Sequence, residues 1–288
     1  MLGSAAAGLG IVPFWRAVAR PFTRPLGVQL YTVRSLFPAQ DEPTIKAIAE
    51  IGYKEVEVIH GDLARLSPLL KQHNLKPVSC HFETAIITGN WPKGAAPANS
   101  TWEAAIDDAK KFGVEYMVMP YLPPAERGDL DSYKVLSEKM NHIGQQTRNA
   151  GLQFCYHNHA FEFKGEAGQR PIDVMLKNLD PKSVFFEMDV FWVSVAGNDP
   201  VALMKQLKGR VPLLHLKDKK KGTPVGYVES VSHDTFMEVG NGSLDFPAIL
   251  RAAPLDGVKH YFVEQDYTAG DPVASLKQSY NYLRGLRV

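Results

Sequence analysis

The sequence has little cysteine and no excess of either charge. Its 288 residues include two cysteines, Cys80 and Cys155, and both stand in apolar runs typical of strands. We therefore expect two buried free thiols rather than a disulfide or a reactive thiol. The 32 Lys and Arg residues nearly balance the 31 Asp and Glu residues, for a formal net charge of +1. A chain without an excess positive field does not attract the phosphates of nucleic acids or anionic membranes, so neither partner is expected.

Long hydrophobic runs are also missing after the N-terminal region, where no apolar run reaches the roughly 18 residues of a membrane span. Residues 1–25 differ from the rest, because MLGSAAAGLGIVPFW is small and apolar and has no acidic residue. This stretch resembles the apolar and cleavage region of a bacterial twin-arginine export signal without its basic part. Either the chain was started late or the resemblance is accidental. We expect residues 1–25 to be a signal remnant or disordered leader that the fold does not need, and we favour export to the periplasm over a cytoplasmic location.

From Pro25 onward, short β-branched or aromatic runs alternate with helical patterns, which indicates βαβ units and a parallel sheet. Eight such units in roughly 260 residues are the usual content of a closed (β/α)8 TIM barrel. An open doubly wound sheet would more often carry a Gly-rich phosphate turn after its first strand, and GVQLYTVRSLF has none. We predict one α/β barrel domain over residues 26–288. The expected strands are 27–32, 55–59, 77–81, 116–120, 153–158, 184–189, 213–216 and 260–264.

Helical patterns lie between these strands, and several end at a glycine that can stop a helix. The expected helices are 44–51, 63–73, 102–112, 133–150, 172–178, 201–207, 246–253 and 273–286. Four residues on their apolar faces, Ile45, Ile48, Leu66 and Leu70, should pack against the barrel.

Polar residues follow nearly every expected strand. The C-terminal ends of parallel barrel strands face the active site, so these residues should lie at one mouth. In chain order they are Gln29, Tyr31, Arg34, Glu57, His60, His81, Glu83, His157, Asn158, His159, Glu162, Asp189, Trp192, His215, Lys217, Asp218, Glu264, Gln265 and Asp266.

Acidic residues directly after apolar runs, as in SVFFEMD and HYFVE, need an explanation. An ionised carboxylate at the edge of a core is costly unless a cation or hydrogen bonds compensate it. Strands five to eight each offer one ligand for a hard cation: Glu162, Asp189, His215 and Glu264. Three carboxylates and one imidazole suit Mn²⁺, Mg²⁺, Co²⁺ or Zn²⁺, whereas a structural zinc site favours cysteines. We predict one divalent metal ion at this set.

Each of these residues also has an interpretation without a metal. His215 suits a hydrogen-bonded core histidine, Asp189 suits a helix cap, and Glu162 suits a loop surface. Glu264 is hardest to explain otherwise, because it follows five residues of strand pattern. The joint pattern, rather than any single residue, favours the metal site.

The motifs GVQLYTVR, YHNHAFEF, FEMDVFWV, HLKD, VGNGSLDF and FVEQD resemble those of the xylose-isomerase-like sugar isomerase/epimerase superfamily, which includes endonuclease IV and inosose dehydratase. The resemblance runs from about Leu26 to Arg287 and is strongest to the sugar phosphate isomerase/epimerase branch. It implies that Glu162, Asp189, His215 and Glu264 bind the metal, and that the two glutamates move a proton on either face of the substrate. The implied substrate-binding residues are Gln29, Glu57, His81, His157, Lys217 and Trp192.

Such a metal site stabilises the enediolate that forms when the C–H beside a sugar carbonyl loses its proton. A carboxylate on one face takes the proton, and a carboxylate on the other can return it. Return of the proton gives an epimer or an isomer, whereas loss of a β-leaving group makes the enzyme a dehydratase or lyase. We predict a metal-dependent isomerase or epimerase acting on a sugar or sugar derivative, with a dehydratase or lyase acting on a keto-sugar or inosose as the alternative.

Two alternative functions from other classes of protein remain open. A non-catalytic sugar-binding barrel would have lost a base or ligand, whereas all four positions are filled here. A phosphodiesterase of the endonuclease branch would need a basic DNA-binding face, against which the net charge of +1 argues. We expect a small sugar or polyol as the partner and leave a homo-oligomer open.

Overall fold

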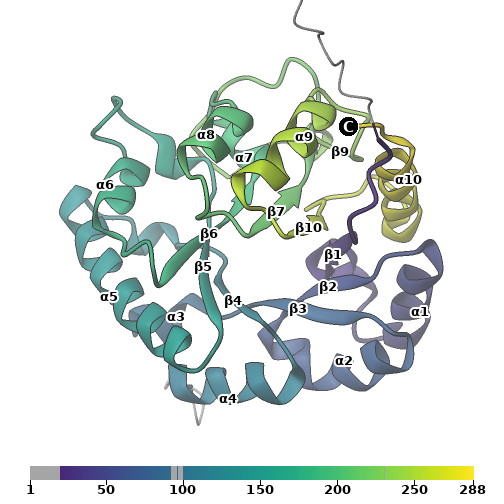
Figure 1. The fold of residues 1–288 in the computed structure, drawn as a ribbon, viewed down its shortest axis with the longest axis horizontal. Coiled ribbons are helices and arrows are strands. Elements are labelled where there is room, and N and C mark those ends of the chain that lie inside the picture. The colour runs from purple at the N-terminus through teal and green to yellow at the C-terminus, as the bar shows by residue number, and fades with distance from the viewer. Residues whose placement is uncertain (1–19, 92–95, 97–99, 230) are drawn as a thin grey trace, which may run out of the picture.

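The computed structural model describes residues 20–91, 96, 100–229 and 231–288. Eight parallel strands close into a barrel in the order β1-β10-β7-β6-β5-β4-β3-β2, and helices surround it (Figure 1). The predicted TIM barrel is therefore confirmed. The barrel strands are β1 (Gly27–Gln29), β2 (Glu55–Ile59), β3 (Lys76–His81), β4 (Tyr116–Met119), β5 (Gln153–His157), β6 (Val184–Asp189), β7 (Leu213–Leu216) and β10 (His260–Val263).

The outer helices bury one face against the barrel. Ile45, Ile48, Leu66 and Leu70 are all buried in the main core, as predicted. The helices are α1 (Asp41–Ile51), α2 (His60–Gln72), α3 (Thr84–Thr88), α4 (Trp102–Phe112), α5 (Leu130–Asn149), α6 (Pro171–Asn178), α7 (Val190–Val195), α8 (Pro200–Gln206), α9 (Phe246–Asp256) and α10 (Pro272–Gly285).

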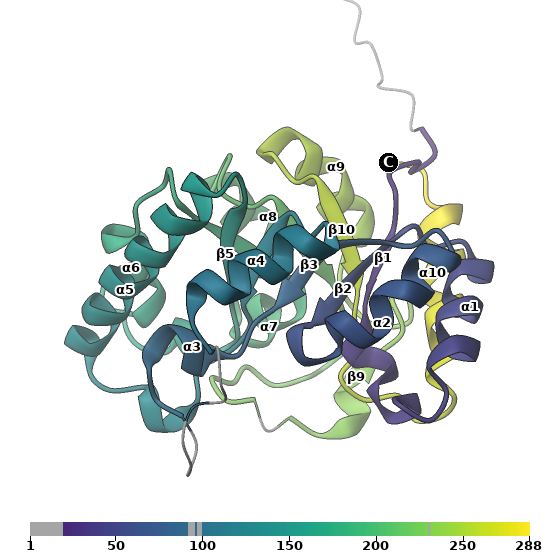
Figure 2. The ribbon, with the colours of Figure 1, turned by 90° about the horizontal axis from the view of Figure 1, so that it is seen from below.

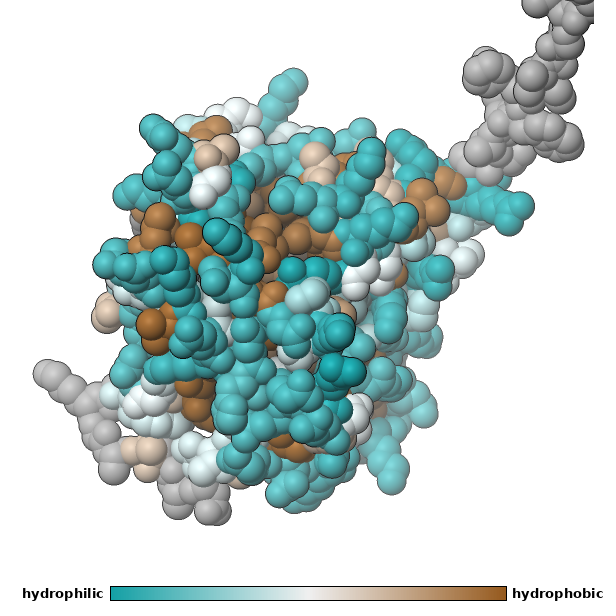
Figure 3. Space-filling model, turned by 60° about the vertical axis from the view of Figure 1, so that its left-hand side comes forward, coloured by the Kyte–Doolittle hydropathy of each residue, from teal (hydrophilic) through white to brown (hydrophobic). Residues whose placement is uncertain are grey.

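The other faces of the helices carry polar side chains. On the face seen in Figure 3, hydrophilic residues prevail and hydrophobic ones show in separate smaller areas. None of the described helices combines the length and hydropathy that crossing a membrane requires.

The interior of the barrel has its own apolar cluster, separate from the layer between strands and helices. Its buried members are Val78, Tyr116, Val118, Cys155, Leu213 and Phe262. Cys155 lies in this cluster and Cys80 in the main core, and both thiols are free, as predicted.

The first strand is shorter than predicted, and some elements were not predicted at all. After β1 the chain enters a 3-10 helix over Leu30–Leu36, because the Gln29 side chain accepts a hydrogen bond from the Tyr31 N–H and turns the backbone. No helix or strand was predicted in the segments that form the short helices α3 and α7. The same holds for the antiparallel pair of β8 (Asp218–Lys219) and β9 (Phe236–Met237).

The connection after β7 is folded around one carboxylate. Asp218 is buried, and its two oxygens accept hydrogen bonds from the backbone N–H groups of Gly240, Gly242, Ser243 and Leu244 at 2.9–3.1 Å. A Cβ on Gly242 would lie 2.3 Å from Asp218 Oδ1, so only glycine permits this approach. The motif VGNGSLDF thus forms a loop whose backbone N–H groups bind the Asp218 side chain.

Residues 20–24 pack with the barrel domain and do not belong to the predicted leader. Arg20 and Phe22 form backbone hydrogen bonds with Val288 and Leu286, and the Phe22 ring is buried against Tyr261. These residues lie with the C-terminus on the side of the barrel opposite β9 (Figure 2). The boundary at Pro25 was therefore placed too late, whereas residues 1–19 of the expected leader lie outside the described residues.

We expect Phe22→Ala to lower the free energy of unfolding by about 3 kcal/mol, the usual cost of truncating a buried phenylalanine. Chemical denaturation followed by tryptophan fluorescence measures the change. Arg20→Ala is the control, because it keeps the backbone pairing and removes only an exposed side chain. An unchanged stability for Phe22→Ala would return residues 20–24 to a dispensable leader.

Candidate metal centre and pocket

A cavity of about 480 Å³ opens where the barrel strands end. Residues that follow seven of the eight barrel strands line it, which places it at the mouth that the sequence predicted. The lining residues are Tyr31, Ile59, His81, Phe82, Glu83, Pro120, Tyr121, His157, His159, Trp192, Lys217, Glu229, Glu264 and Asp266. A second hollow of about 700 Å³ lies beside α4, but the converging acidic and imidazole groups are at the barrel mouth.

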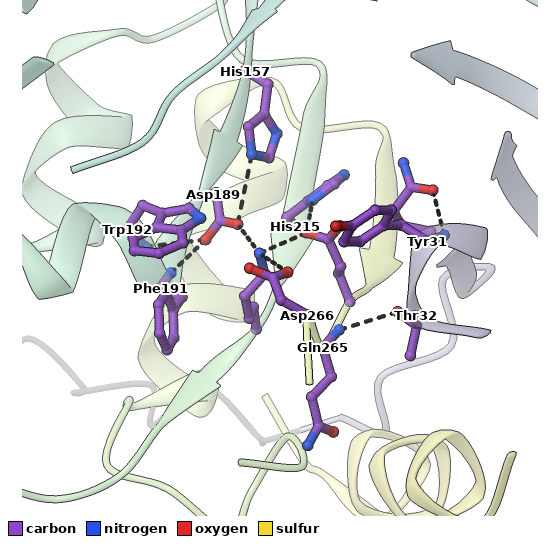
Figure 4. Close-up of polar contacts among 12 residues, drawn as sticks. Tyr31, Thr32, His157, Asp189, Phe191, Trp192, His215, Gln265 and Asp266 are labelled. Atoms are coloured by element: carbon purple, nitrogen blue, oxygen red, sulfur yellow. Dashed lines mark hydrogen bonds and ion pairs between the residues drawn. The ribbon is translucent and has the colours of Figure 1, made fainter. Parts of the chain in front are cut away.

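Four side chains converge at this mouth, and we call them the upper cluster: His157, Asp189, His215 and Glu264. One ligand atom from each lies within 4.8 Å of the others, and all four residues are buried. The Nε2 atom of His157 lies 3.7 Å from Asp189 Oδ2, and the Nδ1 atom of His215 lies 2.9 Å from Glu264 Oε2. Figure 4 shows His157, Asp189 and His215 turned toward one region.

Strand register explains why Asp189 and His215 meet. These residues are Cα partners in the β6–β7 ladder. The carboxylate of Asp189 is divided between two roles: Oδ1 accepts hydrogen bonds from the N–H groups of Phe191 and Trp192, which caps α7 (Figure 4). Oδ2 is buried and has no hydrogen bond of good geometry among the described residues, although Lys217 Nζ lies 3.0 Å away. The helix cap and the proposed ligand are therefore compatible roles of one side chain.

A second group of acidic residues and imidazoles lies beneath the first, and we call it the lower cluster: Glu57, His81 and Glu187, with the inner nitrogens of His157 and His215. Both carboxylates are fully buried. Glu187 Oε2 lies 2.9 Å from His81 Nε2, 3.0 Å from His157 Nδ1 and 3.3 Å from His215 Nε2. Glu57 Oε1 lies 2.7 Å from His215 Nε2 and 2.8 Å from His81 Nε2.

The lower cluster shifts the pKa values of His81 and Glu187 in opposite directions. Burial alone would lower the pKa of His81, but the Glu57 and Glu187 carboxylates outweigh it and raise the pKa to about 10. Burial would likewise raise the pKa of Glu187, yet the charge of His215 and the hydrogen bonds of the histidines hold it well below its ordinary value. The Glu187 carboxylate is therefore ionised and acts as a hydrogen-bond acceptor only.

The two clusters together fit a metal ion. The inner nitrogen of His157 and that of His215 each face a lower-cluster carboxylate, while their outer nitrogens face the upper cluster. A histidine that binds a metal usually donates its other N–H to a carboxylate or carbonyl, which fixes its tautomer. Glu57 is such an acceptor for His215, since its Oε1 lies 2.7 Å from His215 Nε2. The described residues thus contain a buried group that could hold a metal ion.

Lys217 lies at the edge of the upper cluster and is almost completely buried. Its ammonium group lies 3.0 Å from Asp189 Oδ2, 2.7 Å from Glu264 Oε2 and 2.7 Å from Asp266 Oδ1. Burial disfavours the ammonium form, but these three carboxylates outweigh it and raise the pKa of Lys217 well above its ordinary value. Lys217 therefore stays charged at the pocket wall.

Glu162 does not join either cluster, which contradicts its predicted roles as ligand and proton-transfer group. Its carboxylate accepts hydrogen bonds from the Tyr156 hydroxyl at 2.7 Å and from the His159 N–H at 2.9 Å. Burial raises the pKa of Glu162 to about 7 against these hydrogen bonds. A 3-10 turn over Phe161–Phe163 folds the chain back after β5, so Glu162 faces its own loop, and His157 takes the position at the mouth.

Of the six predicted substrate-binding residues, His81, His157, Lys217 and Trp192 line the cavity. Gln29 and Glu57 do not: they are fully buried beneath it, where Gln29 Nε2 donates to Glu57 Oε1 at 2.6 Å. Glu187 was missed, although it stands two residues before Asp189 on the same strand and so faces the same side of β6.

Comparisons with known proteins agree with this architecture. A family model described as xylose isomerase-like TIM barrel matches residues 45–286. A protein named inosose dehydratase from Clostridium beijerinckii is 21% identical over 269 residues, covering 84% of this chain and 88% of that protein.

Solved structures give the same result. A sugar phosphate isomerase/epimerase from Parabacteroides distasonis has 26% identity and a TM-score of 0.71, over 95% of this chain and 98% of that one. The IolI protein, whose structure holds a zinc atom, has 17% identity and a TM-score of 0.67, over 90% and 97%. Because the family model covers more than four fifths of the sequence, the chain belongs to the xylose isomerase-like TIM barrel family.

Proposed function

We propose that this protein is a metal-dependent enzyme that removes the proton beside the ketone of a sugar or polyol and then eliminates a β-leaving group, as a dehydratase or lyase does. One observation carries the choice of elimination. Of the two glutamates predicted to exchange a proton across the substrate, Glu264 lies at the pocket and Glu162 is bonded within its own loop. The relatives named inosose dehydratase support the same choice.

The metal would be held by the upper cluster, through Nε2 of His157, Nδ1 of His215 and the carboxylates of Asp189 and Glu264. Two imidazoles and two carboxylates suit Zn²⁺ or Mn²⁺ better than Mg²⁺, which prefers oxygen ligands. The zinc atom in the IolI structure supports zinc as the first ion to test. A metal bound here would supply a Lewis acid for the ketone oxygen.

The protein's own groups would supply the proton transfers. Glu264 is the base at the reacting C–H, because its carboxylate lines the pocket and lies beside His215. Lys217 would be the acid that protonates the leaving group. Its ammonium group lies 2.7 Å from Glu264 Oε2, so the acid and the base would be in contact. A single base joined to a single acid is the arrangement that an elimination needs.

Isomerisation or epimerisation remains the second candidate, because the Parabacteroides distasonis structure with 26% identity is named a sugar phosphate isomerase/epimerase. Product analysis separates the two: elimination lowers the mass of the product by the leaving group, and isomerisation leaves the mass unchanged. A protein that binds metal and sugar but releases no product and exchanges no proton would be the non-catalytic sugar-binding barrel.

We expect Glu187→Gln and Glu57→Gln to weaken zinc binding by about 10–100-fold, because each removes the acceptor that orients a ligand histidine. Competition with a chromophoric chelator measures the affinity. Glu55→Gln is the matched control, since Glu55 lies on the same strand and contacts His260 instead.

Two further variants locate the ion. Asp189 belongs only to the upper cluster, and His81 belongs only to the lower one. We expect Asp189→Asn to lose more affinity for zinc than His81→Gln does. The reverse order would place the ion among His81, His157, Glu187 and His215.

We expect Glu264→Gln to reduce exchange of the substrate C–H with D2O by about 10²–10⁴-fold, the usual effect of losing one catalytic base. Proton NMR of 2-keto-myo-inositol incubated with the zinc-loaded protein measures the exchange. Metal content is determined in parallel, because Glu264 is also a proposed ligand. Glu162→Gln makes the same substitution at the glutamate outside the pocket and should stay within a few-fold of the parent protein. A folded Glu162→Gln variant without exchange would restore the two-glutamate mechanism.

A further inference from the structure

The pocket lining contains more carboxylates than cations. Glu83, Glu229, Glu264 and Asp266 line it, whereas Lys217 is the single Lys or Arg among the described lining residues. A phosphate group is held in proteins by charged donors or by free backbone N–H groups. A phosphate at this mouth would therefore need one of these two kinds of donor.

Two cations near the mouth, Lys217 and Arg127, are paired with carboxylates, and Arg34 donates to the backbone oxygens of Tyr31 and Asp266 at 2.8 and 2.7 Å. Lys217 lies within 3.0 Å of the carboxylates of Asp189, Glu264 and Asp266. Arg127 Nη2 lies 2.6 Å from Glu229 Oε1, and the Arg127 guanidinium lies 3.5 Å from the centre of the Phe161 ring. A phosphate would have to displace a carboxylate to reach either of them.

The backbone N–H groups of the loop after β7 are also taken. In TIM barrels a phosphate often binds the loops that follow strands seven and eight. Here four N–H donors of that loop, those of Gly240, Gly242, Ser243 and Leu244, point at the Asp218 carboxylate. The chain's own anion thus occupies a concave group of N–H donors of the kind that binds phosphate.

The rest of the lining suits an uncharged polyhydroxy ring. Tyr31, Tyr121 and Trp192 line the cavity with aromatic side chains. The Trp192 Nε1–H is buried and has no hydrogen-bond partner among the described residues, so a substrate hydroxyl can accept from it. Aromatic rings that end in a polar atom match a molecule with C–H faces and hydroxyl edges.

We propose that the pocket accepts an uncharged polyhydroxy ketone and rejects its phosphate ester, and that Glu229 enforces this choice by neutralising Arg127 and adding a carboxylate to the wall. The proposal rests on the proposed function for its reaction and names the substrate class of that site. Like charges brought together at an interface cost enough to exclude a partner. Glu229 is therefore a specificity residue rather than a catalytic one.

Matched pairs test the proposal: D-fructose against D-fructose 6-phosphate, and D-ribulose against D-ribulose 5-phosphate, each followed by C–H exchange in D2O with the zinc-loaded protein. We expect exchange in the free ketoses and little in the esters. Faster exchange in the esters would overturn the proposal and leave the proposed function intact. If no ketone exchanges, including 2-keto-myo-inositol, the proposed function fails, and the binding experiment below decides the substrate class by itself.

That experiment is calorimetric titration of the zinc-loaded protein with inorganic phosphate. Glu229→Ala frees Arg127, and we expect it to bind phosphate about tenfold more tightly than the parent protein does. Glu138→Ala removes an exposed carboxylate from α5 and controls for net charge alone. Equal affinity in the parent protein and Glu229→Ala would overturn the role of Glu229. An equal gain in Glu138→Ala would reduce the effect to net charge and overturn it as well.

Discussion

The mouth of this barrel depends on two carboxylates that are buried where water cannot reach them. Glu57 and Glu187 have no exposed surface, and a buried charge is stable only when paired and hydrogen-bonded. Three histidines from three other positions around the barrel provide that pairing at 2.7–3.3 Å. These pairs offset the cost of burying the carboxylates, and they also fix the imidazole rings in one orientation. In that orientation, two outer nitrogens point toward the cavity.

The barrel brings these groups together through register. His157 is a Cα partner of Glu187, and Asp189 is a Cα partner of His215. Alternate residues of a strand face the same side, so Glu187 and Asp189 stand one above the other on β6. The lower residue orients histidines and the upper one faces the cavity. Asn158 adds a tie across the same strand ends, because its side chain accepts from the Asp189 N–H at 3.1 Å.

Charged groups at the rim of the mouth are also paired with groups of opposite charge. Lys217, Arg127 and the N–H groups of the loop after β7 each face carboxylates of this chain. Such a mouth has donors for hydroxyl groups and surfaces for carbon faces, but Lys217, Arg127 and these N–H groups already bind anions of the chain itself. The charge balance of the whole chain gives no hint of this, because a net charge of +1 averages over groups that lie far apart.

The sequence by itself determined the eight-fold alternation of strands and helices and the residues at the strand ends. Strand bounds at Val184–Asp189 and Leu213–Leu216 agree with the prediction to the residue, because apolar runs of fixed period reflect burial directly. Asp189, His215 and Glu264 could be identified for the same reason, since a polar residue that ends a buried strand must face the mouth or an interior partner. Their convergence is observed as one cluster.

Tertiary structure alone decided which side chain after β5 reaches the upper cluster. Glu162 is five residues beyond His157, and its direction depends on a 3-10 turn and on hydrogen bonds from Tyr156 and His159, which sequence patterning does not specify. The roles of Glu57 and Glu187 depend on contacts to His215 across 158 and 28 positions of sequence. Local pattern determines whether a residue lies on a strand and which face it takes. The contacts of a buried charge across a closed barrel depend on the positions of all the strands. Local sequence therefore does not determine them.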